Sequence, residues 1–385
     1  MNILMINFEY PPLGGGGGVA THDIAQELSQ RHTVHVLTTA FTGLPREEIV
    51  EGVVVHRVPV LGRVSLPTAT FISLITFAPA ALFAGIRIMK KTKFDVVYAQ
   101  FVIPSGLPAA WLSMLFRVPF VLTFVGGDIY DPSKGISPHR HMLLRAVIRW
   151  IASRAHARTA ISTDTKTRTI ELHGVLQPIT VVPIGLKPQH IPEASRDAFG
   201  FLEEDIICIS IGRLVPRKGY DILLSAWKSV PRAKLIIIGD GPLKAHLQTV
   251  VEKYYLAERV QLMGQVDETA KFQLLSLADV YVSAAQHEGF GIVFLEAMRA
   301  GLPIVATNDG GQTDFLIDGE HALLTAPHDD SAIAKAVNTL IDTTELRMVM
   351  GERNKKEVKK YYLEHTVQRI EQILTDTVKN YESHH

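Results

Sequence analysis

The sequence predicts an α/β protein in which two parallel sheets are each wound with helices on both faces. Short apolar runs of strand length alternate with longer segments of helical periodicity along nearly the whole chain, which is the pattern of a doubly wound sheet. The chain has 385 residues, more than one hydrophobic core usually supports. The alternation also restarts after a segment rich in proline and charge. We therefore expect two domains of this class.

The strand candidates are the apolar runs that precede each helix-length segment. They fall at 2–7, 33–38, 53–58, 95–98, 120–124, 158–161 and 179–182 in the first half, and at 206–211, 234–238, 260–263, 280–283 and 303–306 in the second. The join lies within 184–200, where prolines and small residues replace the apolar alternation. We expect a first domain over 1–187 and a second over 188–361. The final helix, 362–385, is long enough to return to the first domain.

Composition and charge exclude several classes of partner. Lys plus Arg and Asp plus Glu number 39 each, so the chain as a whole lacks the positive charge that nucleic acid attracts. Cys208 is the one cysteine and stands inside an apolar run, which fits a buried thiol in a reducing, cytoplasmic compartment. The apolar segment 71–86 is short for a membrane span and contains Pro79. We expect a packed helix there, or one that lies at a membrane surface.

A second segment favours contact with a membrane. The stretch 139–158 carries five arginines and places Leu143, Val147 and Ile151 along one helical face, a pattern found in interfacial helices. A helix that packs these apolar residues in the core and exposes its basic side is an equally good interpretation. Together with 71–86 this segment leads us to expect peripheral contact with the inner face of a membrane.

Five consecutive glycines, 14–18, follow the first strand candidate. Glycine lets a ligand approach the backbone, so a glycine run between a strand and a helix is a candidate anion cradle, and a plain connection is the alternative. Gly15, Gly17 and Ala20 fit a dinucleotide loop, but the second strand candidate ends in threonines rather than in the acidic residue that clamps a ribose. The glycines also lack the Gly-Lys-Ser/Thr of a P-loop. Another phosphate ligand is the better hypothesis.

Two carboxylates flank a glycine-rich helix start within 286–303. Glu288 stands in a loop after a strand candidate, and Glu296 stands in the helix that follows. Glu288 can accept hydrogen bonds from neutral hydroxyls, and Glu296 can accept from a ribose. The amides at the start of the helix can receive phosphate or hydroxyl oxygens, and they belong to Gly289, Phe290, Gly291 and Ile292.

Two cations follow another strand candidate. Arg213 and Lys218 lie in the segment 212–221, where Arg would bind a pyrophosphate through its fork and Lys as a point charge. The sequence lacks a His/Cys/Asp/Glu cluster with metal-ligand spacing and lacks a D-x-D pair. We therefore expect neither a metal ion nor a cofactor.

These segments resemble the retaining, metal-independent glycosyltransferases of family four, which have the two-domain GT-B fold. The resemblance rests on "GGGGGVATHDIAQEL", "GRLVPRKG", "GDGP", "NDGGQTDFLIDG" and the E-x7-E pair in "HEGFGIVFLEAMRAGLPIVAT". It implies two Rossmann-like domains that face each other across a cleft. It also implies that the second domain binds the donor, a nucleotide diphosphate sugar.

The resemblance assigns a role to each candidate residue of the second domain. Arg213 and Lys218 would hold the diphosphate and stabilise it as the leaving group. Glu288 and the amides of 289–291 would hold the hydroxyls of the donor sugar, while Glu296 would take the ribose.

In the first domain the resemblance is weaker. Gly17 and Gly18 would touch the diphosphate as the cleft closes. The family commonly has a "T-x-H-G-x-D" loop, and this chain has Val125 in place of the histidine while it keeps Gly126 and Asp128. Asp128 is therefore a candidate catalytic residue, and the usual acceptor-side histidine is missing.

The sequence thus predicts a retaining hexosyltransferase that moves a sugar from a nucleotide diphosphate sugar to a glycan or lipid-linked acceptor, such as a precursor of a cell-surface polysaccharide. A nucleotide-sugar epimerase of the same fold and a non-catalytic nucleotide-sugar binder are the alternatives. A nicotinamide dehydrogenase is disfavoured by the missing acidic clamp. A hydrolase with paired carboxylates is disfavoured by the phosphate-binding residues.

Overall fold

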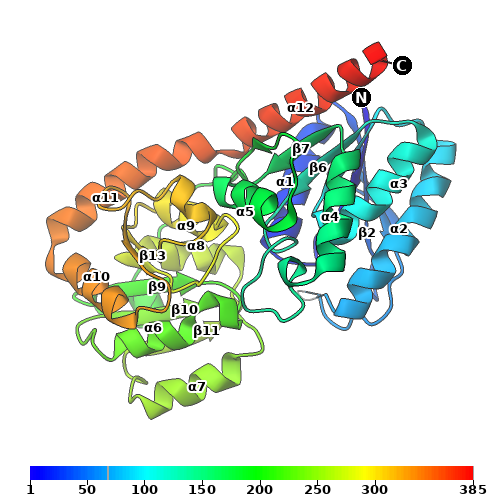
Figure 1. Cartoon of the computed structure of the whole chain (residues 1–385). Coiled ribbons are helices and arrows are strands. Elements are labelled where there is room, and N and C mark those ends of the chain that lie inside the picture. Colours follow the sequence, from blue (N-terminus) through cyan, green and yellow to red (C-terminus); the bar gives the residue numbers. More distant parts are fainter. Residues whose placement is uncertain (67–68, 385) are drawn as a thin grey trace. The chain divides into compact units, whose positions relative to one another are not determined.

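The chain folds into two compact units, described in a computed structural model over residues 1–66 and 69–384 (Figure 1). The first unit comprises Met1–Lys187 together with Leu363–His385, and the second comprises Pro188–Tyr362. Both units are α/β with parallel sheets. The predicted fold class is confirmed.

The sheet of the first unit has eight strands within the described residues, in the order β3-β4-β2-β1-β5-β6-β7-β8. Neighbouring strands are parallel except at β3, which pairs antiparallel with β4. The strands are β1 (Asn2–Ile6), β2 (Thr33–Thr39), β3 (Glu47–Val50), β4 (Val53–Val58), β5 (Val96–Gln100), β6 (Phe120–Phe124), β7 (Ala157–Ala160) and β8 (Thr180–Val181). The sequence misses β3, because a short edge strand that reads Glu-Glu-Ile-Val lacks the apolar run of a buried strand.

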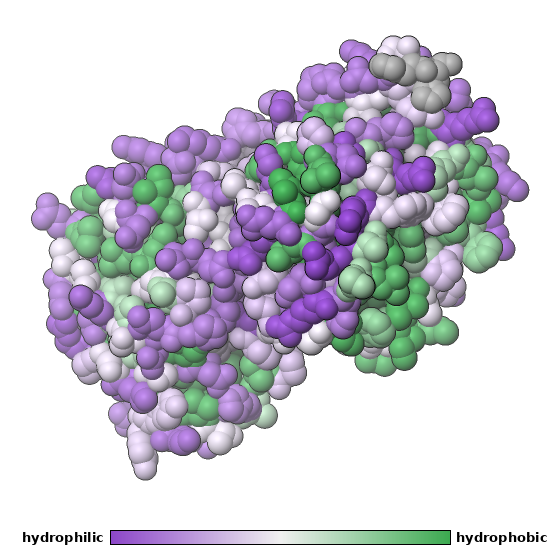
Figure 2. Space-filling view, in the orientation of Figure 1, coloured by the Kyte–Doolittle hydropathy of each residue, from purple (hydrophilic) through white to green (hydrophobic). Residues whose placement is uncertain are grey.

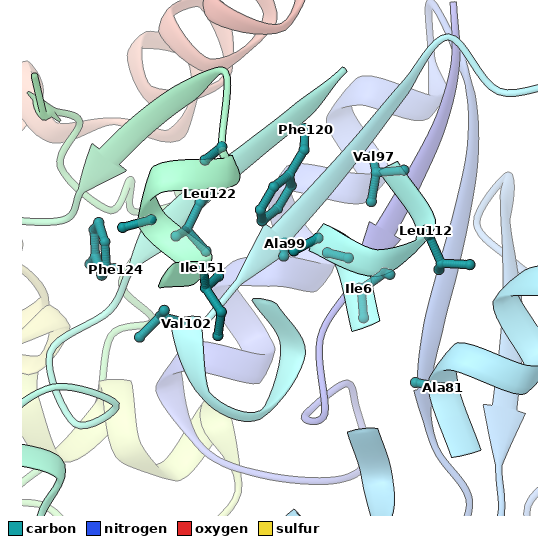
Figure 3. Packing of buried hydrophobic residues seen from close by; sticks show 14 of the residues in the cluster. Ile6, Ala81, Val97, Ala99, Val102, Leu112, Phe120, Leu122, Phe124 and Ile151 are labelled. Atoms are coloured by element: carbon teal, nitrogen blue, oxygen red, sulfur yellow. The ribbon is translucent and has the colours of Figure 1, made fainter. Parts of the chain in front are cut away.

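Helices cover both faces of this sheet. They are α1 (Gly16–Ser29), α2 (Phe71–Lys91), α3 (Leu107–Phe116), α4 (Met142–Arg154), α5 (Thr163–His173) and α12 (Leu363–His384), with the short turns η1 (Val102–Gly106) and η2 (Pro138–Arg140). Alternate strand residues enter two hydrophobic clusters, as the period of two requires. One cluster packs the sheet against α2, α3 and α4 (Figure 3), and the other packs it against α1 and α12.

The last helix belongs to the first unit. Leu363, Val367, Ile370 and Leu374 of α12 are buried against α1 and the sheet. The amide of Leu363 donates to the carbonyl of Leu186 at 3.0 Å. A Cβ on Gly185 would lie 2.4 Å from the Cα of Leu363, so this close approach requires glycine.

The sheet of the second unit has six strands over the described residues, all parallel, in the order β11-β10-β9-β12-β13-β14. The strands are β9 (Ile207–Ile211), β10 (Lys234–Ile238), β11 (Val260–Gly264), β12 (Val280–Val282), β13 (Ile304–Thr307) and β14 (Ala322–Thr325). The helices are α6 (Tyr220–Trp227), α7 (Lys244–Lys253), α8 (Glu268–Leu277), α9 (Ile292–Arg299), α10 (Asp330–Asp342) and α11 (Thr344–Glu357), with the short turns η3 (Asp197–Phe199), η4 (Pro216–Lys218), η5 (Gly311–Asp314) and η6 (Val358–Tyr361). Cys208 is buried on β9.

Local sequence explains where several helices begin. Side-chain oxygens of Thr70, Ser162, Asp267 and Asp329 accept hydrogen bonds from amides in the first turns of α2, α5, α8 and α10. Such caps satisfy amides that have no partner inside the helix. The glycine run behaves differently, because α1 begins at Gly16 and its N-cap, Gly15, provides no side chain.

Candidate active site

The loops after β9 and β12 meet at the carboxyl edge of the second sheet. The two strands are parallel neighbours, with Cys208 opposite Val280 and Ile209 opposite Tyr281. The amide of Gln286 after β12 donates to the carbonyl of Arg217 after β9 at 2.8 Å. Ligands of open α/β sheets bind at this edge, so these joined loops form the candidate site.

A buried carboxylate with two cationic partners lies at the centre of this site. Lys218 Nζ donates to Glu288 Oε1, and Arg217 Nη1 lies 3.2 Å from Glu288 Oε2. Arg217 also donates to the carbonyl of His287 at 2.7 Å. Burial acts to raise the pKa of Glu288, but Lys218 and Arg217 outweigh it and lower the pKa to about 2. Glu288 is therefore an anion that is held in place.

The two loops carry net positive charge. Within the segments 212–219 and 287–291, three cations, Arg213, Arg217 and Lys218, outnumber the single carboxylate of Glu288. The side chain of Arg213 is exposed, so its guanidinium is accessible to a ligand. Because Glu288 neutralises one of these positive charges, the other two can bind an anion such as a diphosphate.

The sequence predicts Arg213 and Lys218 but misses Arg217. Lys218 and Arg217 both lie on η4 and reach Glu288. The adjacent Arg-Lys in "VPRKG" was the available signal. It could not reveal that both side chains meet one carboxylate, 70 positions from Lys218 and 71 from Arg217 in the chain.

Glycines in these loops permit backbone contacts within the protein. Gly219 has φ of +66° and follows η4, and a Cβ there would lie 2.0 Å from the carbonyl oxygen of Ala284. Gly310 has φ of +125°, and a Cβ there would lie 2.4 Å from the carbonyl oxygen of Glu288. The amide of Gly311 donates to that same oxygen at 2.7 Å. The backbone of Glu288 is thus fixed by the loop after β13.

The N-terminus of α9 follows Glu288 directly. Its N-cap, Gly291, has φ of +91°, and Phe290 is buried against the rings of Phe315 and Tyr361. The aromatic contacts fix the turn that presents the first amides of the helix. Amides of a first helical turn have no helical acceptor, so they can bind an oxyanion or a hydroxyl of a ligand.

Glu296 lies on α9 and is also buried. Its Oε1 accepts a hydrogen bond from Lys271 Nζ of α8 at 2.8 Å. Its Oε2 is buried and has no hydrogen-bond partner among the residues the structure describes. Burial raises the pKa of Glu296, with Lys271 opposing the shift. Sequence reasoning found Glu296 and missed Lys271, for which the sequence offers no signal.

The glycine run in the first unit is held by packing and hydrogen bonds. A Cβ on Gly17 would lie 2.5 Å from Cζ of Phe101, and one on Gly18 would lie 3.0 Å from the carbonyl oxygen of Leu13. Gly17 therefore accommodates an aromatic ring of its own unit. A Cβ on Gly15 would have no described atom within 4 Å, so Gly15 is the open position in the run.

A buried chain of polar side chains ties the first turn of α1 to the sheet. The hydroxyl of Thr21 donates to the carbonyl of Gly17 at 2.9 Å, and it lies 2.6 Å from Gln100 Oε1. Neighbouring hydrogen bonds continue across β5, β6 and β7 through Tyr98, Thr123 and Thr159. Such satisfied buried networks fix one arrangement of the chain. The start of α1 is thus positioned by β5–β7.

Asp128 is buried and held by backbone amides of its own unit. Its Oδ2 accepts from the amide of Val102 at 2.6 Å, and its Oδ1 accepts from the amide of Val125 at 3.1 Å. Burial raises the pKa of Asp128 to about 6 against the opposing effect of these hydrogen bonds. Both oxygens accept from the backbone of their own unit, so Asp128 positions the segments at Val102 and Val125, and its catalytic role stays a prediction.

The helix predicted to be interfacial, α4, turns its apolar residues inward. Ile148, Ile151 and Ala152 are fully buried in the cluster that α4 shares with the sheet, while Met142 and Leu143 at its start are exposed. The alternative interpretation, a core-facing helix with a basic outer side, therefore describes most of α4.

The described residues contain no group of three or more His, Cys, Asp and Glu side chains that could hold a metal ion. Within the same residues, α2 is the helix long and apolar enough to cross a membrane by length and composition, which is weak evidence for a span.

Both Rossmann-like units match models of glycosyltransferase domains. Residues 15–185 match the glycosyl transferase 4-like domain, and residues 192–357 match the glycosyl transferases group 1. The chain is a glycosyltransferase of the group 1 family.

Individual proteins agree with this assignment. The chain is 28% identical over 361 residues to a glycogen synthase of Mycobacterium tuberculosis, covering 89% of this chain and 86% of the relative. The fold is similar to that of sucrose-phosphate synthase from Thermosynechococcus elongatus, with a TM-score of 0.83, 20% identity and 98% of each chain covered. It is also similar to Anabaena HepE in complex with UDP-glucose, with a TM-score of 0.78, 21% identity, and 98% and 100% coverage.

Proposed function

We propose that the protein transfers a hexose-type sugar, with retention of configuration and without a metal ion, from a nucleotide diphosphate sugar to an acceptor. The observation that carries this proposal is the ion-pair network of Lys218 and Arg217 with Glu288 at the carboxyl edge of β9 and β12. It supplies fixed cations for a diphosphate and an anchored carboxylate for sugar hydroxyls. The relative bound to UDP-glucose supports this class of donor.

In the proposed reaction the bond from the anomeric carbon to the diphosphate oxygen breaks. The acceptor oxygen bonds to the same face of the sugar, and its proton passes to the departing diphosphate. Negative charge grows on that leaving group, so Arg213, Arg217 and Lys218 would stabilise the transition state more than the ground state. These side chains would do the work that a divalent cation does in other sites.

Glu296 would accept a hydrogen bond from the ribose of the donor. Its Oε2 is buried and unpartnered among the described residues, and an unsatisfied buried oxygen is costly unless a ligand supplies a donor. A ribose hydroxyl would satisfy it, while Lys271 holds the other oxygen. Gly289, Phe290, Gly291 and Ile292 would offer amides to the donor at the start of α9.

The donor is identified by thermal-shift measurements with UDP-, GDP- and ADP-sugars, because a ligand that binds the folded state raises the melting temperature. The matching donor is then incubated with candidate glycan and lipid-linked acceptors, and the product is read by NMR. A new glycosidic bond with the donor's anomeric configuration supports the proposal. Inverted configuration contradicts retention, and loss of turnover in EDTA contradicts metal independence.

Two other functions predict different products. An epimerase would give a changed sugar without an acceptor, and a non-catalytic binder would give a thermal shift without turnover. A precursor of a cell-surface polysaccharide at the cytoplasmic face of the membrane is the acceptor that we propose. Glycogen synthase, the name of one relative, supports a glycan acceptor.

A further inference from the structure

The outer side of α2 is apolar although it faces solvent. The buried stripe of this helix repeats every four residues, at Ser73, Phe77, Ala81, Gly85 and Met89. The opposite side carries Phe71, Ile72, Ile75 and Phe83, each more than half exposed. A helix that is apolar all round is normally buried, so we expect a binding partner to cover this outer side.

The loop before α2 extends the same surface. Leu61 and Val64 are more than half exposed. The loop is fastened to the helix, because the amide of Leu61 donates to Thr76 Oγ1 at 3.1 Å and Thr70 Oγ1 donates to the carbonyl of Gly62 at 2.8 Å. Figure 2 shows hydrophobic side chains gathered over the region of α2, at lower right. We call this surface the α2 face, formed by Leu61, Val64, Phe71, Ile72, Ile75 and Phe83.

Positive charge adjoins the α2 face. Arg87, Lys90 and Lys91 are exposed on the last turns of α2, about one to two turns beyond Phe83. Arg87 and Lys91 line a cavity of about 330 Å³ whose lining also includes His35, Arg46 and His56, with Glu47 as its acidic member. The apolar strip from residue 71 to 83 is about 18 Å long, and the cations follow at its end.

The charge of the surrounding sequence is strongly one-sided. Residues 52–163 contain thirteen Lys and Arg against three Asp, in a chain whose total charges balance. Two of those three, Asp128 and Asp131, are buried. The exposed charges of this segment are therefore almost all positive. They attract an anionic surface that comes within a Debye length of them.

We propose that the α2 face docks on an anionic lipid bilayer, with α2 lying in the plane of the interface. Apolar side chains would enter the headgroup and acyl boundary while Arg87, Lys90 and Lys91 contact lipid phosphates, as in interfacial helices.

A span is disfavoured because the buried stripe of α2 packs on the sheet. A second copy is disfavoured because an isologous contact would bring two cationic segments together. The proposal deepens the proposed function, since it places the enzyme where a lipid-linked acceptor resides.

The test is sedimentation of the full chain with two kinds of vesicle, one of phosphatidylcholine alone and one in which about a third of the lipid is phosphatidylglycerol. We expect binding to the anionic vesicles that weakens at about 0.5 M salt. Phe83→Ser and Arg87→Glu should each weaken it by about tenfold. Both side chains are exposed, so folding should survive, and melting temperatures verify this.

Leu176→Ser is the matched control, because Leu176 is 88% exposed outside the α2 face. Its binding should equal that of the parent. The inference is overturned if the parent ignores anionic vesicles, if Leu176→Ser weakens binding as much as Phe83→Ser, or if the α2 face instead mediates a dimer in sedimentation equilibrium. Turnover of the donor with a soluble acceptor is measured in parallel. Turnover without vesicle binding overturns this inference alone, whereas vesicle binding without turnover overturns the proposed function alone.

Discussion

Lys218 and Glu288 form a buried ion pair that joins the loops after two neighbouring parallel strands. The partners are 70 positions apart in the chain. Lys218 Nζ donates to Glu288 Oε1, and Arg217 supplies the second cation. A carboxylate that is neutralised in this way can accept sugar hydroxyls beside a diphosphate without repelling it. The pair therefore serves both the fold and the proposed chemistry.

Lys218→Ala should lower turnover by about two to three orders of magnitude, the loss typical of one removed transition-state contact. The melting temperature should also fall, because the buried Glu288 loses one of the two cationic partners that it has among the described residues and retains Arg217. Steady-state kinetics and thermal unfolding measure the two effects. Lys335→Ala, an exposed lysine on α10, should change neither. Unaltered turnover in Lys218→Ala would remove Lys218 from the mechanism.

The ion pair also predicts how stability depends on pH. The pKa of Glu288 is lowered from 4.5 to about 2 in the folded chain. Stability from this group is thus present above pH 4.5 and is lost as the pH falls toward 2, by at most about 3 kcal/mol. Glu288→Gln should be less stable at pH 7 and should lose less stability between pH 5 and 3. Melting temperatures across this range test it, and parallel curves for parent and variant would contradict it.

The sequence predicted the fold well where strands are buried. Runs such as Ile207–Ile211 and Lys234–Ile238 are central parallel strands, and these are continuously apolar because both faces are covered. The edge strands Glu47–Val50 and Ala322–Thr325 were missed. The two missed strands have four residues each, too few for a clear periodicity, whereas the other edge strands, Thr180–Val181 and Val260–Gly264, coincide with predicted runs.

The site was predicted in part, for a physical reason. Glu288 and Lys218 stand out because each follows an apolar run and adjoins glycine. Arg217 and Lys271 were missed because their contacts depend on which loops and helices meet in space. Gly17 also lacks a side chain for a second reason, since a Cβ there would collide with the ring of Phe101. The sequence does not reveal this contact, and the donor contact of Gly17 stays a prediction.

The contrast between two glycines tests whether a ligand approaches this loop. A Cβ on Gly17 would lie 2.5 Å from the ring of Phe101, whereas one on Gly15 would meet no described atom within 4 Å. Gly17→Ala should therefore cost about 1–3 kcal/mol through overpacking. Gly15→Ala should cost at most about 1 kcal/mol, the usual N-cap difference.

If a diphosphate contacts this backbone, Gly15→Ala should still raise the KM for the donor severalfold while the melting temperature stays nearly constant. Gly43→Ala is no suitable control, because Gly43 has φ of +84°. Gly135→Ala is suitable, since a Cβ there also has open space in the described structure. An unchanged KM for the donor in Gly15→Ala would make the loop a plain connection.

Asp128 should make stability depend on pH in the opposite direction to Glu288. Burial raises its pKa from 3.8 to about 6, so the stability it contributes is fully present below pH 3.8 and is lost as the pH rises through 6, by about 3 kcal/mol. Asp128→Asn should remove this slope between pH 4 and 6, although it loses one acceptor for the amides of Val102 and Val125 at about 1–3 kcal/mol. Melting temperatures at pH 4, 5, 6 and 7 separate the change of stability with pH from the constant loss caused by the substitution.

Glu204→Gln removes an exposed carboxylate and should keep the parent's dependence of stability on pH. If Asp128→Asn keeps it as well, Asp128 is ionised throughout this range and its carboxylate is available for a catalytic role.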